Sequence, residues 1–330
     1  MVTRKDVAER AGVSVATVSY VMNHTKKVTP EVEKRVRDAI EELGYRPNLI
    51  ARSLVTKQTH HVAMLVDNLK NPHNTSVLEG AQSVASSRGY MISSLLVDYA
   101  NQDMILELTA RGVDGYLLFH PGKKQEFMKL LKNQYWVIAD EEDLTIDCKE
   151  AIFKAVESLK DHGHEQIAYL SGLSIYGEKD HYRLKNYREA MEEYDLPLNE
   201  NLIIDGNPKQ TTDELAGMEA VRRLLASRET FTTIMAVNDL MAIGAIRELH
   251  LHGIRVPEDV SVVGCDNIRE TLYSVPSIST LDVKSFDHGR YLMEKLICKM
   301  EGRKFSPVTI HADYIERESV GKNKKGYLQA

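Results

Sequence analysis

The stretch that decides the fold of the N-terminal region is Gly12-Val13-Ser14-Val15-Ala16-Thr17-Val18-Ser19-Tyr20-Val21-Met22-Asn23. A helical pattern that begins at Arg4 ends at Gly12. Ser14 then predicts the start of a second helix, because its hydroxyl can accept the free amide protons of the next turn. Two short helices joined by a tight turn that contains glycine are typical of the helix-turn-helix motif, whose second helix enters the major groove of DNA. The stretch therefore predicts a DNA-binding head.

The residues around this stretch supply a small apolar core and a third helix. Both predicted helices carry apolar residues on one face, which are Val7, Ala8 and Ala11 on the first and Val18, Val21 and Met22 on the second. Thr29-Pro30-Glu31 combines an N-cap, a proline at the first helical position and an acidic first turn, so it predicts a third helix, which ends at Gly44. Three such helices close one core, and residues 1–46 are expected to form one all-α domain.

Composition divides the 330 residues into a basic head and an acidic remainder. Residues 1–60 contain eleven Lys or Arg and seven Asp or Glu, a formal charge of +4, whereas the remainder carries −10 of the total of −6. This asymmetry favours an anion-binding module attached to a body that does not bind DNA. The three cysteines have no CxxC spacing, and the sequence shows neither a signal peptide nor a membrane span. We therefore expect a cytoplasmic protein.

From His61 onward, short apolar strands alternate with amphipathic helices. The expected strands cover 62–66, 92–97, 115–119 and 136–139 in a first series, and 167–170, 202–204, 233–237 and 260–264 in a second. Continuous apolar strands that alternate with helices predict parallel sheets covered on both faces. Two series imply two doubly wound subdomains, and a ligand is expected where the carboxyl ends of their strands face each other.

Motifs along nearly the whole chain resemble those of the lactose/galactose repressor (LacI/GalR) family. The matching residues are Val13-Ser14-Val15-Ala16-Thr17-Val18-Ser19, Asn23, Glu42-Leu43-Gly44-Tyr45-Arg46-Pro47-Asn48, Ala51-Arg52-Ser53-Leu54, Asn71-Pro72, Gly112-Val113-Asp114-Gly115, Gly163-His164, Asn238-Asp239-Leu240-Met241-Ala242-Ile243-Gly244-Ala245 and Val256-Pro257-Glu258-Asp259-Val260-Ser261-Val262-Val263-Gly264-Cys265-Asp266. The resemblance implies a DNA-binding head, a hinge helix and a sugar-binding-protein-like core that dimerises.

The resemblance also implies a division of the chain. The head comprises residues 1–46, a hinge helix or linker comprises 47–60, and an effector-binding and dimerisation core comprises 61–330. Within the core, one periplasmic-binding-protein-like subdomain is expected at about 61–160 with a late crossover segment, and the other at 161–282 with a C-terminal segment.

Candidate DNA contacts lie on the second helix and around it. Exposed positions early in that helix, Val15, Ala16, Thr17 and Tyr20, are expected to read bases, because small apolar side chains suit methyl contacts with thymine. The alternative for Val15 is core packing. Phosphate contacts are expected from Ser14, Thr17, Ser19, Asn23, Lys26 and Arg52, although local capping explains Ser19 and Asn23 equally well. Thr3 and Lys57 complete the predicted DNA-binding set.

Leu54 is the candidate for a contact in the minor groove. In the family that this chain resembles, the residue that matches Leu54 is wedged between bases at the operator centre. An apolar wedge costs unstacking energy but bends the duplex, so that more surface is contacted. The alternative is a leucine buried against its own core or that of a dimer partner, and its polar neighbours argue against this.

The resemblance also identifies candidate effector contacts, which are Asp140, Arg183, Asn238 and Asp266. Aspartates accept pairs of sugar hydroxyls, and a guanidinium donates to sugar oxygens. The alternative for Arg183 is a surface helix arginine, and Asp239 is expected to be a helix N-cap. His73 and Asn74 stand where many relatives have two stacking aromatic residues, which predicts a more polar pocket. A hexose, an oligosaccharide, a sugar acid or another polyol remains open as the ligand.

These features together predict a transcriptional regulator, most often a repressor, that binds a pseudo-palindromic operator as a dimer and responds to a small effector. A solute-binding protein of a sugar transporter has the same core but predicts a secretion signal and no DNA-binding head. A sugar-acting α/β enzyme would need a paired acid and base, and no GxSxG elbow is present. His162-Gly163-His164 and His250-Leu251-His252 have no completing ligands for a metal site. We expect neither cofactor nor metal.

Overall fold

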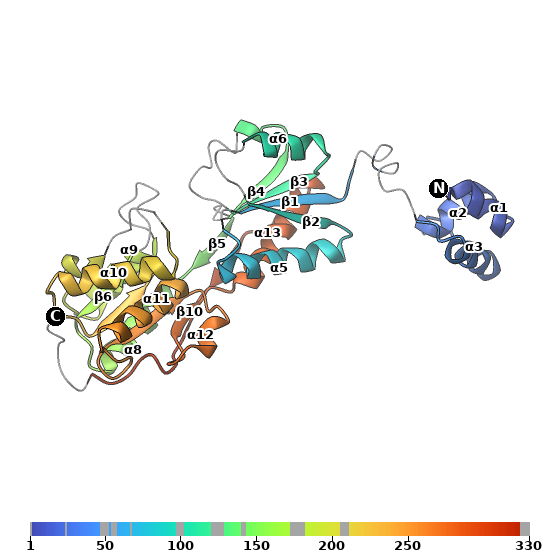
Figure 1. The fold of residues 1–330 in the computed structure, drawn as a ribbon. Helices are drawn as coiled ribbons and strands as arrows, with labels where there is room; N and C mark the ends of the chain where they lie inside the picture. Colours follow the sequence, from blue (N-terminus) through green and yellow to red (C-terminus); the bar gives the residue numbers. More distant parts are fainter. Residues whose placement is uncertain are drawn as a thin grey trace. The chain divides into compact units, whose positions relative to one another are not determined.

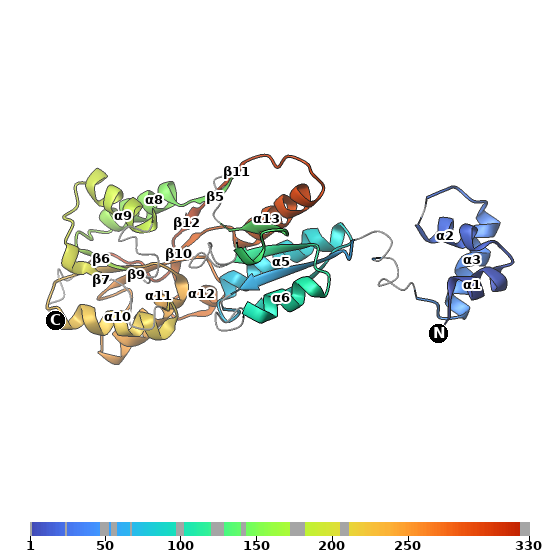
Figure 2. The same cartoon turned by 90° about the horizontal axis from the view of Figure 1, so that it is seen from above.

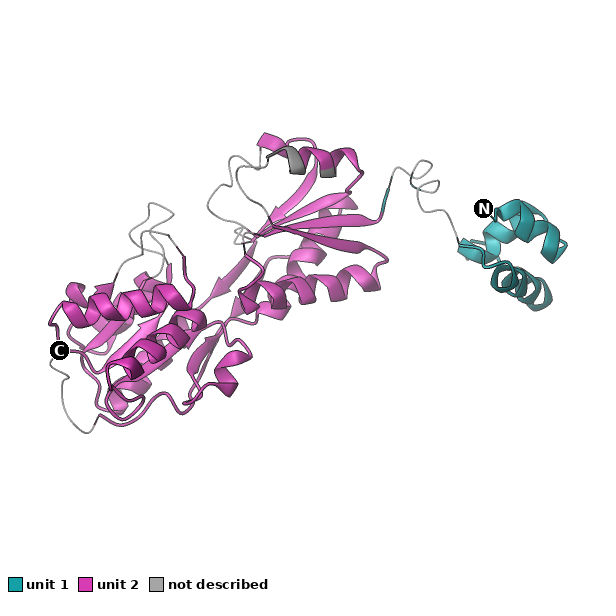
Figure 3. Cartoon of the chain, in the orientation of Figure 1, with its two compact units in different colours: residues 1–59 teal, residues 60–330 magenta. Residues whose placement is uncertain are grey.

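The computed structural model describes residues 2–23, 25–46, 53, 58–66, 68–96, 102–119, 129–139, 143–171, 182–204 and 211–323. The chain forms two compact units, Met1–Thr59 and His60–Ala330, which are considered separately (Figure 3). Within the described residues, no helix combines the length and the apolar character needed to cross a membrane.

The N-terminal unit contains the three predicted helices, α1 (Arg4–Ala11), α2 (Val15–Asn23) and α3 (Pro30–Glu42). Thr3 and Asp6 form a reciprocal capping box on α1, and Gly12 ends that helix in the left-handed conformation at φ 64°. Thr29 caps α3, which has Pro30 in its first turn. The core consists of buried side chains from all three helices and the following turn, which are Val7, Ala8, Ala11, Val18, Val21, Val36, Ala39 and Tyr45. Local capping signals therefore predicted this unit correctly.

The first subdomain of the C-terminal unit is a parallel four-stranded sheet in the order β2-β1-β3-β4. Its strands are β1 (His61–Val66), β2 (Met91–Leu96), β3 (Gly115–Phe119) and β4 (Tyr135–Ile138). Helix α5 (Pro72–Ser87) and helix α13 (Ser285–Met300) pack on one face, and α6 (Gln102–Ala110) covers the other (Figure 1). A helix from the end of the chain thus completes the first subdomain.

The second subdomain has a six-stranded sheet in the order β12-β10-β9-β8-β6-β7, in which only the β12–β10 pair is antiparallel. Its strands are β6 (Ile167–Leu170), β7 (Ile203–Ile204), β8 (Thr233–Ala236), β9 (Ser261–Cys265), β10 (Ser279–Asp282) and β12 (Asp313–Ile315). One face is covered by α8 (Lys149–Asp161) and α9 (Tyr182–Glu193), and the other by α10 (Glu214–Ala226) and α11 (Asp239–Leu251) (Figure 2). Short helices η2 (Glu200–Leu202) and α12 (Glu270–Tyr273) precede β7 and β10.

Within the residues that the structure describes, the chain passes between the two subdomains three times. The first passage is β5 (Leu144–Asp147), the second leads from β10 to α13, and the third leads from β11 (Val308–His311) to β12. Strands β5 and β11 run parallel and pair with each other, with Leu144 opposite Val308.

One expectation about these passages differs from the structure. Helix α8 packs into the core of the second subdomain, so the first passage lies at 144–147 and not near residue 160. The apolar stripe of α8 does not reveal which sheet the helix covers, and this explains the difference. In the third passage, the buried Ala312 separates β11 from β12, and each of these strands pairs in a different sheet.

Candidate functional site

The surface of α2 presents the small apolar side chains expected to read bases. Val15 is 45% exposed and Ala16 is exposed, whereas Val18 and Val21 are buried in the core of the unit. Core packing is therefore excluded as the explanation for Val15. Thr17 and Tyr20 are half-buried on the same helix. The Lys26 Nζ atom lies 4.9 Å from the centre of the Tyr20 ring.

The polar candidates of the N-terminal unit have local structural roles. Ser14 Oγ accepts a 3.1 Å hydrogen bond from the Thr17 amide, which confirms Ser14 as the cap of α2. Asn23 Nδ2 donates to Ser19 Oγ at 3.1 Å, and Thr3 belongs to the capping box of α1. These bonds fix the orientation of the side chains that could contact DNA. Arg52, Leu54 and Lys57, and Asp140 in the C-terminal unit, lie outside the described residues.

Arg183, near the start of α9, lies in the cleft between the subdomains of the C-terminal unit. Its side chain is 14% exposed, and Nη1 donates to the Val237 carbonyl at 2.7 Å, directly after β8. Nε donates to the Tyr182 hydroxyl at 3.1 Å, and Nη2 lies 3.7 Å from Asp266 Oδ1. These contacts exclude a surface helix arginine. The Arg183 guanidinium is thus held beside the Asp266 carboxylate.

His73, from the first subdomain, lies next to Asp266 in the same cleft. Its Nδ1 atom lies 2.7 Å from Ser285 Oγ and 3.8 Å from Asp266 Oδ1, and its ring centre is 5.7 Å from that of Phe119. Burial, together with the positive charge of Arg183, lowers the pKa of His73 to about 3. The imidazole is therefore neutral near pH 7. Its contact with Asp266 is a polar contact between a neutral ring and a carboxylate.

Asp266 follows β9 and is contacted from both subdomains. Burial raises the pKa of its carboxyl to about 6, and the charge of Arg183 opposes this rise. The residue has a φ of 119° and the next, Asn267, has a φ of 55°, so two consecutive residues without glycine's freedom have positive φ. Beside Asp266 and His73 lies a cavity of about 700 Å³ that also borders Ser285, Lys284 and Arg317. The described residues thus form a polar cavity between the subdomains.

One expected cap needs correction, and two expected effector contacts, Asn74 and Asn238, also have structural roles in the loops around the cleft. Asn238, not Asp239, caps α11: its Oδ1 accepts from the Met241 amide at 2.9 Å, and its Nδ2 donates to the Thr212 carbonyl at 2.9 Å. Both ends of the Asn238 amide are thus bonded within the second subdomain. Asn74 is likewise buried, and its Nδ2 donates to the Asn68 carbonyl. Both asparagines shape the loops around the cleft.

Ser285 and Phe119 were missed as site residues. Ser285 lies 212 positions from His73 in the sequence, so no local pattern could pair them. Phe119 ends an apolar strand and resembles a core residue, although its ring lies next to that of His73. In this chain the aromatic face in the cleft comes from the end of β3, and not from the two positions after Asn71-Pro72.

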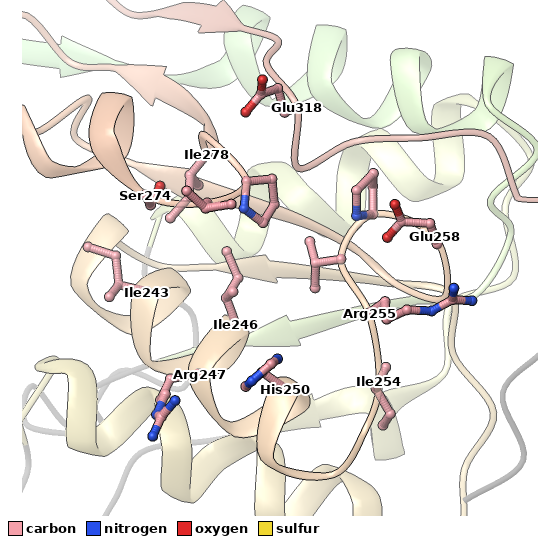
Figure 4. A pocket seen from close by; sticks show the side chains of 14 residues that line it. Ile243, Ile246, Arg247, His250, Ile254, Arg255, Glu258, Ser274, Ile278 and Glu318 are labelled. Carbon is pink, nitrogen blue, oxygen red and sulfur yellow. The ribbon is translucent and has the colours of Figure 1, made fainter.

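A separate apolar groove of about 910 Å³ lies on the second subdomain. Figure 4 shows Ile243 and Ile246 of α11 facing Ile278, with Ile254 at one end. Beside the groove, Val275 is 92% exposed and Tyr273 is 71% exposed. Large apolar side chains that are exposed together in this way are typical of an interface.

Two family models match the chain, each over one part of it. Residues 3–48 match the model of bacterial regulatory proteins of the lacI family. Residues 156–320 match a periplasmic binding protein-like domain. The first match covers the unit with the exposed helix α2, and the second covers most of the second subdomain.

Curated relatives and solved structures agree with these matches. Catabolite control protein A from Priestia megaterium is 34% identical over 308 residues, which cover 89% of this chain and 91% of that protein. The transcriptional regulator AscG from Escherichia coli is 34% identical over 97% of this chain and 98% of its own length. The structure of the transcriptional regulator CelR in complex with cellobiose is similar with a TM-score of 0.69 and 27% identity, over 97% of this chain and 100% of that one. The chain therefore belongs to the lacI family of bacterial regulatory proteins, and it is a DNA-binding transcriptional regulator.

Proposed function

We propose that this regulator is a repressor whose DNA binding is controlled by a small carbohydrate-like effector bound between the two subdomains. The observation that carries the proposal is the convergence of His73, Arg183 and Asp266 from both subdomains on one polar cleft. A ligand that contacts all three holds the subdomains at one angle, and this gives it different affinities for the open and closed states.

The chemistry of these groups favours a polyhydroxyl ligand. The Asp266 carboxylate accepts hydrogen bonds from a pair of hydroxyls, the Arg183 guanidinium donates to oxygens, and the neutral imidazole of His73 can do either. Phe119 adds an aromatic face beside His73. The similarity to CelR, which was solved with cellobiose, supports a sugar. Asp140, Asn74 and Asn238 remain proposed members of the site, the two asparagines through the loops that they hold.

On the DNA side, we assign base reading to Val15, Ala16, Thr17 and Tyr20 of α2. Exposed Val15 and Ala16 permit close approach of the helix to the floor of the major groove. The phosphate contacts are assigned to Thr3, Ser14, Ser19, Asn23, Lys26, Arg52 and Lys57. Leu54 is proposed as the apolar wedge in the minor groove, and its neighbour Arg52 supplies positive charge there.

Two heads are needed for a pseudo-palindromic operator, and we propose that a second copy of this chain supplies the other head. The exposed side chains of Tyr273 and Val275, next to the apolar groove, support an interface on the second subdomain. The protein then acts in the cytoplasm, where the operator DNA lies. Since the relatives are transcriptional regulators, we propose no enzymatic activity.

The test combines sugar binding with DNA binding in the full chain. A thermal-shift panel of cellobiose, glucose, ribose and gluconate identifies the ligand class, because a ligand at 100 times its Kd stabilises by about 2.7 kcal/mol. DNA sites are selected from a random duplex library and then titrated with and without the sugar.

In this test, Arg183→Met is expected to lower sugar affinity at least tenfold and to leave DNA affinity without sugar unchanged. Arg188→Met, five residues later on the same helix, is the matched control, because Arg188 bonds Glu200 on the surface. Selected DNA without two-fold symmetry, or sugar binding that Arg183→Met does not weaken, contradicts the proposal.

A further inference from the structure

The loop between β9 and β10 has an unusual backbone at the point where it enters the cleft. Asp266 and Asn267 have φ values of 119° and 55°, a conformation that side-chain-bearing residues adopt only when their surroundings hold them there. The loop then turns through α12 and returns, with the Ile278 amide donating to the Thr271 carbonyl at 2.9 Å. Groups outside the loop must therefore hold Asp266 and Asn267 in this conformation.

Asp239 holds the loop from the side of α11. Its carboxylate is fully buried, Oδ2 accepts from the Ile268 amide at 2.9 Å, and Oδ1 accepts from Thr280 Oγ1 at 2.6 Å. Gly264 provides the space for this carboxylate, because a Cβ atom at that position would lie 2.1 Å from Asp239 Oδ1. One buried carboxylate thus joins the loop to β10.

Arg317 holds the same loop from the C-terminal segment. Its Nη2 donates to Asn267 Oδ1 at 2.6 Å, and its Nη1 donates to Thr271 Oγ1 at 2.9 Å and to the Ile278 carbonyl at 2.8 Å. The guanidinium therefore bonds to the start, the middle and the end of the loop. The backbone of Arg317 is itself fixed, since its amide donates to Ser279 Oγ at 2.8 Å.

We propose that Asp239 and Arg317 are positioning residues that hold residues 266–271 so that the Asp266 carboxylate faces the effector. They act through the loop: Asp239 through the Ile268 amide, and Arg317 through the side chains of Asn267 and Thr271. The result is the observed position of Asp266, between Arg183 and His73. This inference rests on the proposed function, in which Asp266 contacts the ligand.

The first test needs no ligand. Hydrogen–deuterium exchange of the full chain is measured for the wild type, Arg317→Met and the matched control Arg188→Met, whose arginine bonds the Glu200 carboxylate in the second subdomain. Arg317→Met is expected to speed amide exchange in residues 266–271 at least tenfold and to leave Val262 and Val263 of β9 unchanged. Unchanged exchange in the loop, or equal loss of protection across the whole subdomain, overturns the proposal.

Asp239→Leu tests the other contact with a side chain of similar length. Leucine has no acceptor atom, so the Ile268 amide and the Thr280 hydroxyl both lose their partner. Faster exchange of the Ile268 amide, by tenfold or more, is expected. Protection equal to that of the wild type overturns the role of Asp239.

The second test separates positioning from general stability. Full-length variants are titrated with cellobiose by calorimetry, and Arg317→Met is expected to weaken binding at least tenfold. The double variant Asp266→Asn with Arg317→Met is expected to bind no more weakly than Asp266→Asn alone, because Arg317 acts through Asp266. Additive losses overturn the proposal. If the wild-type chain does not bind cellobiose, a disaccharide is not the effector of the proposed function. The hydrogen–deuterium exchange experiment then tests by itself whether Asp239 and Arg317 position the loop.

Discussion

The ionisable residues of the cleft have opposite effects on how the free energy of unfolding changes with pH. Burial lowers the pKa of His73 to about 3, and it raises the pKa of Asp266 to about 6 and that of Asp239 to about 7. Between pH 6.5 and 3 the unfolded chain binds a proton at His73 and the folded chain does not, so acid destabilises the fold through this residue. The two carboxyls have the opposite effect, because the folded chain binds their protons at higher pH than the unfolded chain does.

His73→Gln is therefore expected to make the protein gain stability more steeply as the pH falls from 6.5 to 4.5. In this pH range His73 titrates only in the unfolded state. Its removal therefore changes the slope of the unfolding free energy against pH by up to about 1.4 kcal/mol per pH unit. Urea unfolding at a series of pH values measures this slope, and Asp266→Asn serves as the control with the opposite change. Parallel curves for wild type and His73→Gln would show that the imidazole is not held neutral.

Single residues also show how far the sequence predicts the site. Gly12, Ser14 and Thr29 were assigned correctly because caps depend on neighbours within four positions. The cap of α11 was assigned to Asp239 but is Asn238, since both residue types cap helices and only the tertiary structure shows which one precedes the first turn.

At the level of helices and strands, the closest packing in the first subdomain joins α5 to α13. A Cβ atom at Gly289 of α13 would lie 1.9 Å from the Val77 carbonyl oxygen, and one at Gly80 of α5 would lie 1.9 Å from that of Phe286. The two glycines thus let the backbones touch. The N-termini of both helices carry cleft residues, His73 on α5 and Ser285 on α13, so this packing fixes the wall of the effector site.

Gly289→Ala is expected to destabilise the chain by about 1–3 kcal/mol, because the added methyl group has no space and the helices must separate. It is also expected to weaken sugar binding by moving Ser285 away from His73. Urea unfolding and a sugar titration measure the two effects, and Gln82→Ala, at an exposed position of α5, is the control. Wild-type stability in Gly289→Ala would contradict the close backbone contact.

The elements themselves followed from periodicity, but their partners did not. Strands β6, β7, β8 and β9 lie within about two residues of the expected ranges, as for β6 at 167–170. A late crossover to the first subdomain was expected, but the short β5 and β10 were not predicted. Four-residue strands carry little periodic pattern, and the choice of sheet depends on contacts over more than a hundred residues.

For the whole molecule, the proposed dimer puts the exposed apolar side chains of the second subdomain in contact with a second copy. Val275→Asp is expected to raise the dimer dissociation constant at least 100-fold, because a charge would be buried without a partner. Sedimentation velocity measures the constant, and Leu215→Asp, at a residue 68% exposed on α10, is the control. A Val275→Asp chain that dimerises like the wild type would place the interface elsewhere.

The three passages between the subdomains also determine which pieces of the gene can encode a folded product. The first subdomain needs α13, which is encoded after most of the second, and the second needs β12, which is encoded after α13. A chain that stops at residue 283 therefore lacks part of both halves. Neither half can be exchanged between relatives as a single uninterrupted segment, so recombination can transfer the N-terminal unit alone but must inherit the C-terminal unit whole.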